Sequence, residues 1–438
     1  MHFSIPITEK VVDSLGSRYV LYSVYLEGFL FCKVRYSQLH RWDVQLRRAF
    51  GGSVPLFPPK FYLAMTKPMV AERRLQLEHY LQNVGVHPHI SNSEVFGRFL
   101  KKLQLETFRI PSEKAVLNIF LPDGRTITID VETSNTAERV LEVLSYKLEI
   151  PRQLMGYFSL FIVQDSINGN FSVLKRIVDF ELPYVTLWNM KAERCRIGIR
   201  KWYMNPSLDK MLMNCTAAVN LIYIQALQEI ERNWSQPTQA QMQKLELEKG
   251  SNKIKFLELM QGVKHYGYLQ LSPCTCDYPE PNCTATVYMG NGEVSCRVTL
   301  LSNKVEEVCF NVNRMRCWQV TFLIPNLEEQ GHRQEQKLEL KFEYSDLDSW
   351  RWITIYTDQA FLLSSCLQKS FSEELMLPAK GDLEMQIEVP LEDKMKKPSK
   401  QQRKTSENLQ VTTRITSENQ ILGKGKYEVF AQIREEDL

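Results

Sequence analysis

The chain has 438 residues, of which 44% are hydrophobic and 24% are charged, and its formal net charge is +3. A chain of this length is expected to form roughly two to four domains. The small net charge gives no indication of nucleic-acid binding, and neither a signal peptide nor an apolar run long enough for a membrane-spanning helix is recognisable. The 10 cysteines are scattered without a Cys-x-x-Cys pair, which favours free thiols over a zinc site at residues 274–283.

The first hundred residues predict a small sheet followed by helices. Residues 19–36 alternate with a period of two on either side of Glu27-Gly28, which is typical of a β-hairpin. Apolar residues at helical spacing then predict three helices. These helices cover about residues 37–50, 70–84 and 94–103.

Three separated cations in this unit form a candidate phosphate pocket. Arg35 is followed by Tyr36 and Ser37, Lys60 follows a proline-rich turn, and Arg73 lies early in the second helix. Arginine offers phosphate a planar fork of donors, and lysine offers a point charge. A tyrosine ring offers a flat wall to a sugar face. The pattern therefore predicts a pocket for a phosphorylated ring alcohol.

Over about residues 1–108 this pattern resembles the phox-homology (PX) domain, the phosphoinositide-binding module of sorting nexins. The resemblance implies that Arg35 binds the 3-phosphate, that Tyr36 stacks on the inositol ring and that Ser37 makes a secondary phosphate contact. It also implies that Lys60 binds the 1-phosphate and that Arg73 binds the 4- and 5-hydroxyls. Phosphatidylinositol 3-phosphate is therefore the expected lipid partner.

The second unit, residues 109–203, is predicted to be ubiquitin-like. It begins with two alternating segments on either side of Pro122-Asp123-Gly124, a tight hairpin signal, and continues with a helix from Asn135. Three more strands are predicted at residues 157–163, Val185–Trp188 and 194–200. The third unit, residues 204–268, has three helical patterns and no strand, which predicts a small bundle.

From residue 269 the period returns to two, and six strands are predicted before one long helix from Asp358 to about Met376. Strands closed by a C-terminal helix are typical of pleckstrin- and phosphotyrosine-binding-type sandwiches. Such a sandwich binds an extended peptide along an open strand edge. The remaining residues, 391–438, contain a basic run and few aromatics and are predicted to be a disordered tail.

A ubiquitin-like unit, a helical bundle and a capped sandwich in this order resemble the F1, F2 and F3 lobes of a FERM module. With a PX domain in front, the chain is similar to the PX-FERM sorting nexins of the 17/27/31 branch. The stretches Gly156–Phe161, His265–Tyr268 and Arg314–Trp318 carry this resemblance. No PDZ-like domain precedes the PX domain, unlike the 27 type, and the short tail favours the 31 type. The expected architecture is thus an α+β multidomain protein with PX (1–108), F1 (109–203), F2 (204–268), F3 (269–390) and a disordered tail (391–438).

The resemblance implies that F3 binds Asn-Pro-x-Tyr or Asn-x-x-Tyr signals in the cytoplasmic tails of transmembrane receptors, including integrin-like cargo. The candidate peptide contacts are Trp318 on the expected edge strand and Leu367, Phe371 and Leu375 on the last helix, with plain core packing as the alternative for each. The terminal Glu436, Asp437 and Leu438 resemble a tail that recruits the retriever recycling complex, with an ordinary frayed end as the alternative.

No nucleophile or phosphate-loop signature is present, so no catalytic residue, metal or cofactor is expected. The expected protein is a monomeric, non-enzymatic adaptor on the cytosolic face of early endosomes. Its expected role is to promote recycling of cargo and to prevent lysosomal degradation. A FERM-type linker between membrane and cytoskeleton, and a lipid-modifying enzyme with a PX targeting domain, are the alternatives.

Overall fold

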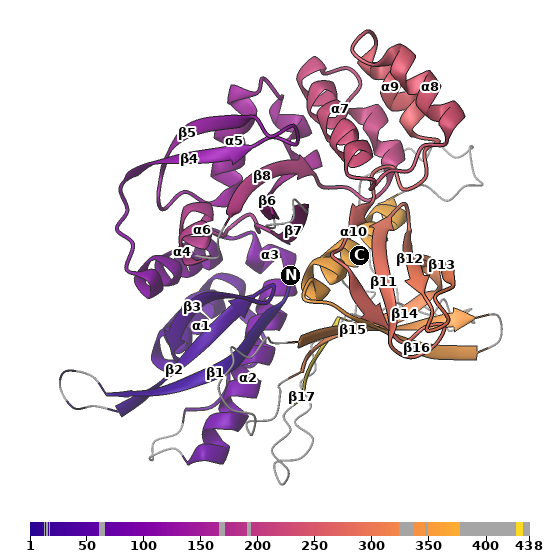
Figure 1. The fold of residues 1–438 in the computed structure, drawn as a ribbon. Coiled ribbons are helices and arrows are strands. Elements are labelled where there is room, and N and C mark those ends of the chain that lie inside the picture. The colour runs from indigo at the N-terminus through magenta and orange to yellow at the C-terminus, as the bar shows by residue number, and fades with distance from the viewer. Residues whose placement is uncertain are drawn as a thin grey trace, which may run out of the picture.

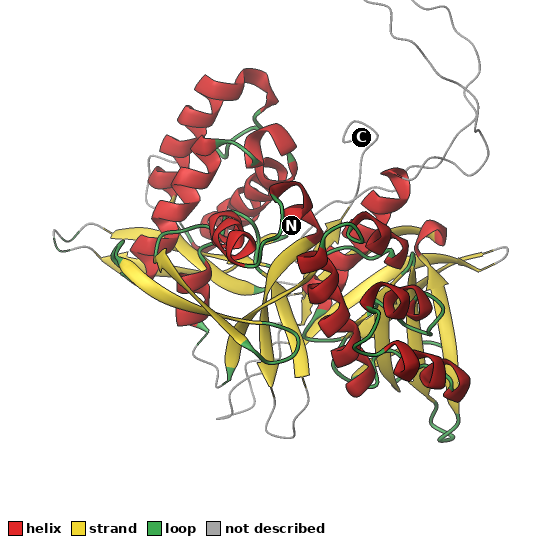
Figure 2. Cartoon of the chain, turned by 90° about the horizontal axis from the view of Figure 1, so that it is seen from above, coloured by secondary structure: helices red, strands yellow, loops and turns green. Residues whose placement is uncertain are grey.

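The computed structural model describes residues 1–12, 14, 16, 18–60, 66–165, 171–190, 194–323, 337–346, 349–376 and 426–431. Its elements follow the expected order of a PX domain, a ubiquitin-like F1 lobe, a helical F2 lobe and an F3 sandwich closed by a helix (Figure 1). In the view from above, the helices form separate groups beside the sheets rather than one layer (Figure 2).

The PX domain is an antiparallel sheet in the order β1-β2-β3 with helices packed against it. Its elements are β1 (Phe3–Val12), β2 (Arg18–Leu26), β3 (Phe29–Arg35), α1 (Tyr36–Phe50), α2 (Lys67–Val86), α3 (Pro88–Ser91) and α4 (Glu94–Phe108). The predicted hairpin turn between β2 and β3 is present. Gly28 lies in this turn with a φ of 82°, a conformation that glycine adopts at no steric cost.

The apolar core of the PX domain is completed by the next lobe. The ring of Phe180 stacks 6.4 Å from that of Phe3 and lies edge-on 5.3 Å from that of Phe96. The side-chain oxygen of Gln104 on α4 accepts a hydrogen bond of 3.0 Å from the backbone N–H of Leu182. The PX domain and F1 therefore share a continuous interface of aromatic rings and satisfied polar groups.

F1 is a five-stranded sheet in the order β5-β4-β8-β6-β7 with α5 packed against it. Its elements are β4 (Lys114–Phe120), β5 (Thr126–Glu132), α5 (Ala137–Lys147), β6 (Phe158–Asp165), β7 (Phe171–Arg176), α6 (Pro183–Asn189) and β8 (Cys195–Lys201). The predicted strand at Val185–Trp188 is wrong, because this segment is helix α6. Pro183 occupies the first turn, where its missing N–H costs nothing, while Val185 is buried and Trp188 is exposed.

F2 consists of α7 (Thr216–Glu231), α8 (Gln239–Glu248) and α9 (Lys253–Met260), preceded by the 3-10 helix η3 (Pro206–Met211). A buried carboxylate in η3, that of Asp209, joins F2 to F1. It accepts hydrogen bonds from the hydroxyls of Tyr203 and Tyr266 and from Nε2 of Gln261. Burial raises the pKa of both phenols, so both remain protonated donors to the charge that they surround.

F3 contains a bent sheet in the order β13-β12-β11-β10-β16-β15-β14-β17, with β9 beside β11, closed by α10. Its elements are β9 (Leu269–Gln270), β10 (Cys274–Cys276), β11 (Cys283–Gly290), β12 (Glu293–Thr299), β13 (Val305–Asn311), β14 (Met315–Leu323), β15 (Lys337–Asp346), β16 (Ser349–Tyr356), α10 (Ala360–Met376) and β17 (Lys426–Ala431). The sequence does not predict β17, which lies within the expected tail. Its six residues pair with β14.

One buried carboxyl gives the PX fold a pH dependence. Oε2 of Glu78 on α2 accepts a hydrogen bond of 2.7 Å from the backbone N–H of Ile5, whereas Oε1 has no hydrogen-bond partner in the described part of the chain. Burial raises the pKa of Glu78 to about 7, against the opposing effects of this bond and of Arg74. The unfolded carboxyl, with a pKa of 4.5, loses its proton first, so this group lowers the free energy of unfolding as the pH rises from 4.5 to about 7.

Glu78→Gln keeps the shape of the protonated carboxyl and cannot ionise. Its free energy of unfolding, relative to that of the parent chain, should therefore rise between about pH 5 and about pH 8, on the order of 2–3 kcal/mol. Denaturant unfolding at the two pH values measures this difference. The exposed Glu72 on the same helix provides the control, since Glu72→Gln should leave the difference unchanged. A pH-independent offset for Glu78→Gln would contradict the assignment.

Candidate lipid and peptide sites

The structure places two of the predicted lipid-binding arginines on aromatic faces. Arg35 ends β3, and its Cζ lies 3.4 Å from the centroid of the Tyr19 ring. Arg73 lies on the second turn of α2, and its Cζ is 4.3 Å from the centroid of the Tyr36 ring. Stacking fixes the plane of each guanidinium. Both donor forks are therefore oriented before any ligand binds.

The side chains of Tyr36 and Arg73 also form hydrogen bonds with the proline-rich turn before Lys60. The Tyr36 hydroxyl donates a hydrogen bond of 2.8 Å to the carbonyl of Pro58, and Nη2 of Arg73 donates one of 3.2 Å to the carbonyl of Pro59. Lys60 is exposed and directly follows Pro59, whose carbonyl accepts the bond from Arg73, so the backbone of Lys60 lies near the Tyr36–Arg73 pair. Ser37 is exposed in the first turn of α1.

Sequence reasoning missed Tyr19 and Phe57 as parts of this pocket. Arg35 is opposite Leu21 in the sheet register, so Tyr19, two residues from Leu21, presents its ring on the same face as Arg35. The alternation of residues 19–36 contained this signal. The ring of Phe57 lies 5.4 Å from that of Tyr36 and supports it from the turn, a contact that only tertiary folding creates.

In F3, the strand expected to bind peptide already has an added partner. β14 pairs with β15 along one edge and antiparallel with β17 along the other. The register on the β17 side runs from Trp318 opposite Ala431 to Leu323 opposite Lys426. An extended segment hydrogen-bonded to a sheet edge has the geometry of β-strand addition, the mode predicted for a sorting signal.

The side chains proposed to hold the peptide are mostly buried. Trp318 is fully buried and its Nε1 donates a hydrogen bond of 2.9 Å to Oγ of Ser364 on α10, so an added strand can reach only its backbone. Leu367 is fully buried as well, whereas Phe371 is half-buried at the margin of the core. The side chain of Leu375 and all of Glu436, Asp437 and Leu438 lie outside the described residues.

The cysteines near the start of F3 are buried and form no disulfide. Burial raises the pKa of Cys274 to about 12 and that of Cys276 to about 11, which keeps both protonated. Among the residues that the structure describes, no group of three or more His, Cys, Asp or Glu side chains could hold a metal ion. Within the same residues, no helix combines the length and apolar character needed to cross a bilayer.

Comparison with protein families gives matches along most of the chain, in the order of its lobes. The PX domain family matches residues 29–103, and the sorting nexin 17/27/31 FERM F1 lobe matches residues 115–204. The sorting nexin 17/31 FERM F2 lobe matches residues 205–264, and the sorting nexin 17 FERM C-terminal domain matches residues 267–375. The expected fold class is confirmed.

Several curated proteins are similar over nearly the full length. Sorting nexin-31 of Homo sapiens is 52% identical over 441 residues, which cover 100% of both chains. Sorting nexin-31 of Mus musculus is 54% identical over 400 residues, 91% of each chain, and sorting nexin-17 of Homo sapiens is 41% identical over 87% of this chain and 83% of its own.

Among solved structures, a designed CISK-PX domain is 30% identical, with a TM-score of 0.21, and the match covers 23% of this chain and 97% of that one. The full-length relatives are far more informative, and sorting nexins 31 and 17 are non-enzymatic adaptors. The chain belongs to the PX-FERM sorting nexins of the 17/27/31 branch.

Proposed function

We propose that this chain is an endosomal cargo adaptor that binds phosphatidylinositol 3-phosphate through its PX domain and Asn-Pro-x-Tyr or Asn-x-x-Tyr signals through F3. Binding both promotes recycling of transmembrane receptors and prevents their lysosomal degradation. Membership of the sorting nexins implies endosomal sorting. The PX domain implies phosphoinositide binding and the FERM module implies peptide binding.

The observation that carries the peptide part is the pairing of β17 with β14. The edge of β14 accepts an extended segment of this chain in antiparallel register from Trp318 to Leu323. Backbone hydrogen bonds supply most of the affinity in this mode, so a receptor tail can use the same edge. The burial of Trp318 and Leu367 supports a division of roles in which both keep the groove rigid and Phe371 offers its ring to the peptide.

β17 and a receptor peptide then compete for one edge. A segment of the same chain is present at an effective concentration on the order of millimolar, so a peptide must displace it. This competition raises the apparent dissociation constant of the peptide without changing the groove. The proposed function therefore predicts that removing β17 strengthens peptide binding.

The lipid part is tested at Arg35. Arg35→Gln removes the charge and the fork and should cost about 2–3 kcal/mol of charge-assisted hydrogen bonding to the 3-phosphate. Sedimentation with liposomes that contain phosphatidylinositol 3-phosphate should show binding reduced to background, with the melting temperature nearly unchanged. Arg48→Gln, which changes an exposed arginine on α1 and alters the net charge equally, should bind as the parent does. Equal binding by both variants would exclude this pocket.

The peptide part is tested by a paired proline substitution in β17. Glu428 and Val429 are consecutive, so their N–H groups point to opposite sides, and the Glu428→Pro/Val429→Pro variant loses a donor toward β14 in either case. Calorimetry with an Asn-Pro-x-Tyr receptor peptide should give an affinity at least several-fold higher than that of the parent. Ile433→Pro/Arg434→Pro, outside β17, is the matched control and should leave the affinity unchanged. Equal affinities in all three chains would place the peptide elsewhere than the β14 edge.

A further inference from the structure

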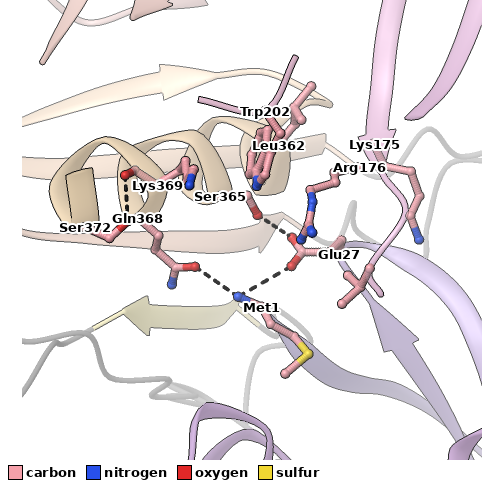
Figure 3. Close-up of a pocket in the computed structure, with 11 residues that line it drawn as sticks. Met1, Glu27, Lys175, Arg176, Trp202, Leu362, Ser365, Gln368, Lys369 and Ser372 are labelled. Atoms are coloured by element: carbon pink, nitrogen blue, oxygen red, sulfur yellow. Dashed lines mark hydrogen bonds and ion pairs between the residues drawn. The ribbon is translucent and has the colours of Figure 1, made fainter. Parts of the chain in front are cut away.

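The turn between β2 and β3 of the PX domain docks onto α10, the helix that closes F3. The carboxylate of Glu27 accepts a hydrogen bond of 3.0 Å from the Ser365 hydroxyl and another of 3.1 Å from the backbone N–H of His2. Figure 3 shows Glu27 facing Ser365, with the Met1 nitrogen between Glu27 and Gln368 of α10. A cavity of about 240 Å³, also lined by Arg176 and Trp202 of F1, adjoins this contact (Figure 3).

Glu27 and His2 are buried in this contact, and both carboxylate oxygens of Glu27 accept hydrogen bonds. Burial alone would raise the pKa of Glu27, but the charge of the Met1 ammonium, the charge that His2 gains at low pH, the charge of Lys175 and the hydrogen bond from Ser365 together leave it lowered, so the carboxylate is ionised at neutral pH. Burial, aided by the Met1 ammonium, lowers the pKa of His2 to about 4 against the opposing effect of Glu27, so its imidazole is neutral. An ionised carboxylate is an acceptor on both oxygens, which suits the hydrogen bonds that Glu27 receives from His2 and Ser365.

The second feature of this contact is the close approach of Gly28 to α10. A Cβ built on Gly28 would lie 2.8 Å from Cδ2 of Phe361, which belongs to the first turn of α10 and is 3% exposed. That distance is shorter than any real contact, and the aromatic ring is held in the core. Only a residue without a side chain lets the turn approach α10 so closely.

Two of the α10 residues that contact the PX domain, Phe361 and Ser364, also contact β14. Oγ of Ser364 lies 2.8 Å from Nε2 of His2 and accepts the hydrogen bond from Nε1 of Trp318. The ring of Phe361 lies 5.7 Å from that of His2 and 5.3 Å from that of Phe322. Two short chains of contacts therefore run from the PX domain through α10 to β14.

Both chains end within the part of β14 that forms the peptide edge. Trp318 and Phe322 are opposite Ala431 and Tyr427 in the pairing with β17, so they span the register used by an added strand. Their side chains point into the core while their backbones form the edge. Any shift of either ring moves the hydrogen-bonding groups that an incoming peptide must match.

We infer that the PX domain positions the peptide-binding edge of F3: the docked β2–β3 turn fixes Phe361, His2 fixes Ser364, and these two residues hold β14 in the geometry that accepts an added strand. Ser364 is a positioning residue in this arrangement and touches no ligand. The inference rests on the proposed binding of peptide at β14. Its consequence is that a change in the lipid-binding domain, remote from the peptide, weakens peptide binding.

Gly28→Ala tests this inference, and Gly16→Ala is its matched control. Both glycines lie in hairpin turns of the PX domain with φ near 80°, but nothing lies within 4 Å of a Cβ on Gly16. In the full chain carrying Glu428→Pro/Val429→Pro, which removes competition by β17, Gly28→Ala should weaken binding of an Asn-Pro-x-Tyr peptide by at least about fivefold relative to Gly16→Ala, the cost of about one neutral hydrogen bond. Liposome binding should be equal in the two variants. Equal peptide affinities would overturn the inference.

Ser364→Ala supplies an independent variant should Gly28→Ala lose liposome binding through misfolding of the PX domain. It should weaken peptide binding by a similar factor with liposome binding intact. The double variant Gly28→Ala/Ser364→Ala should lose less than the product of the two effects, because both substitutions act through the same helix, α10, on the same strand, β14. A fully multiplicative loss, or no loss in Ser364→Ala, would contradict the positioning role.

Hydrogen exchange of the Trp318 indole separates failure of this inference from failure of the proposed function. The indole N–H, identified by loss of its nuclear magnetic resonance signal in Trp318→Phe, should exchange faster in Gly28→Ala than in Gly16→Ala. If the chain carrying Glu428→Pro/Val429→Pro binds no peptide, the proposed function is refuted, while this readout still decides whether the PX domain is coupled to β14. Equal exchange rates in the two glycine variants would overturn the coupling itself.

Discussion

The structure depends on the packing of α10 against more than one domain. One face packs into the F3 sandwich through Leu363, Cys366 and Leu367, none of which is exposed. On the opposite face, the PX domain covers two further buried residues: Gly28 in the β2–β3 turn approaches Phe361, and His2 contacts Ser364. A helix that packs against neighbours on two opposite faces cannot shift toward one of them without disturbing the other.

Polar contacts at the two ends of α10 add F1 to this arrangement. Just before its first turn, Nε2 of Gln359 donates a hydrogen bond of 2.6 Å to the carbonyl of Val173 on β7. In its last turns, Oε2 of Glu373 accepts hydrogen bonds of 2.9 Å from the backbone N–H groups of Met204 and Asn205, which follow F1. Leaving a buried carboxylate without its hydrogen-bond partners costs free energy, so these bonds oppose separation of the lobes. Helix α10 of F3 therefore connects F3 to both the PX domain and F1.

The sequence predicts the periodic parts of this structure and fails where tertiary contacts decide. The strands of F3 and the helix after them have clear periods, and the hairpin at Glu27-Gly28 has a turn signal. The segment Val185–Trp188 is too short for its pattern to distinguish a strand from a helix. Pro183, two residues before it, is typical of the first turn of a helix and indicates the correct assignment. For β1, no prediction was made from its mixed pattern, and β17 forms only because β14 offers it an edge.

The candidate lipid residues could be proposed from the sequence because their charges and rings are visible in it. The buried position of Trp318 could not be predicted in this way. Arg35, Tyr36 and Arg73 are charged or aromatic groups at element ends, and the fold brings Tyr36 and Arg73 into contact. Trp318 was identified correctly as lying on the strand that has an added partner, but the direction of a side chain in a strand depends on register. A displacement of one residue would send its ring to the other face. The fully buried ring and its bond to Ser364 are properties of the packed lobe alone.

Rigid joining of the domains has a consequence for two weak binding sites. In the proposed function, a lipid pocket with few charged contacts and a short strand edge each bind their ligand with modest affinity. The two binding constants multiply only when binding of the second ligand is effectively intramolecular. A flexible linker would spread the second site over many orientations. The docked turn at Glu27 and Gly28 removes that freedom before either ligand binds, so its entropy is lost during folding rather than during binding. Under the proposed function, the contacts between the PX domain and α10 therefore increase the selectivity for membranes that carry both lipid and cargo, although none of these contacts involves either ligand.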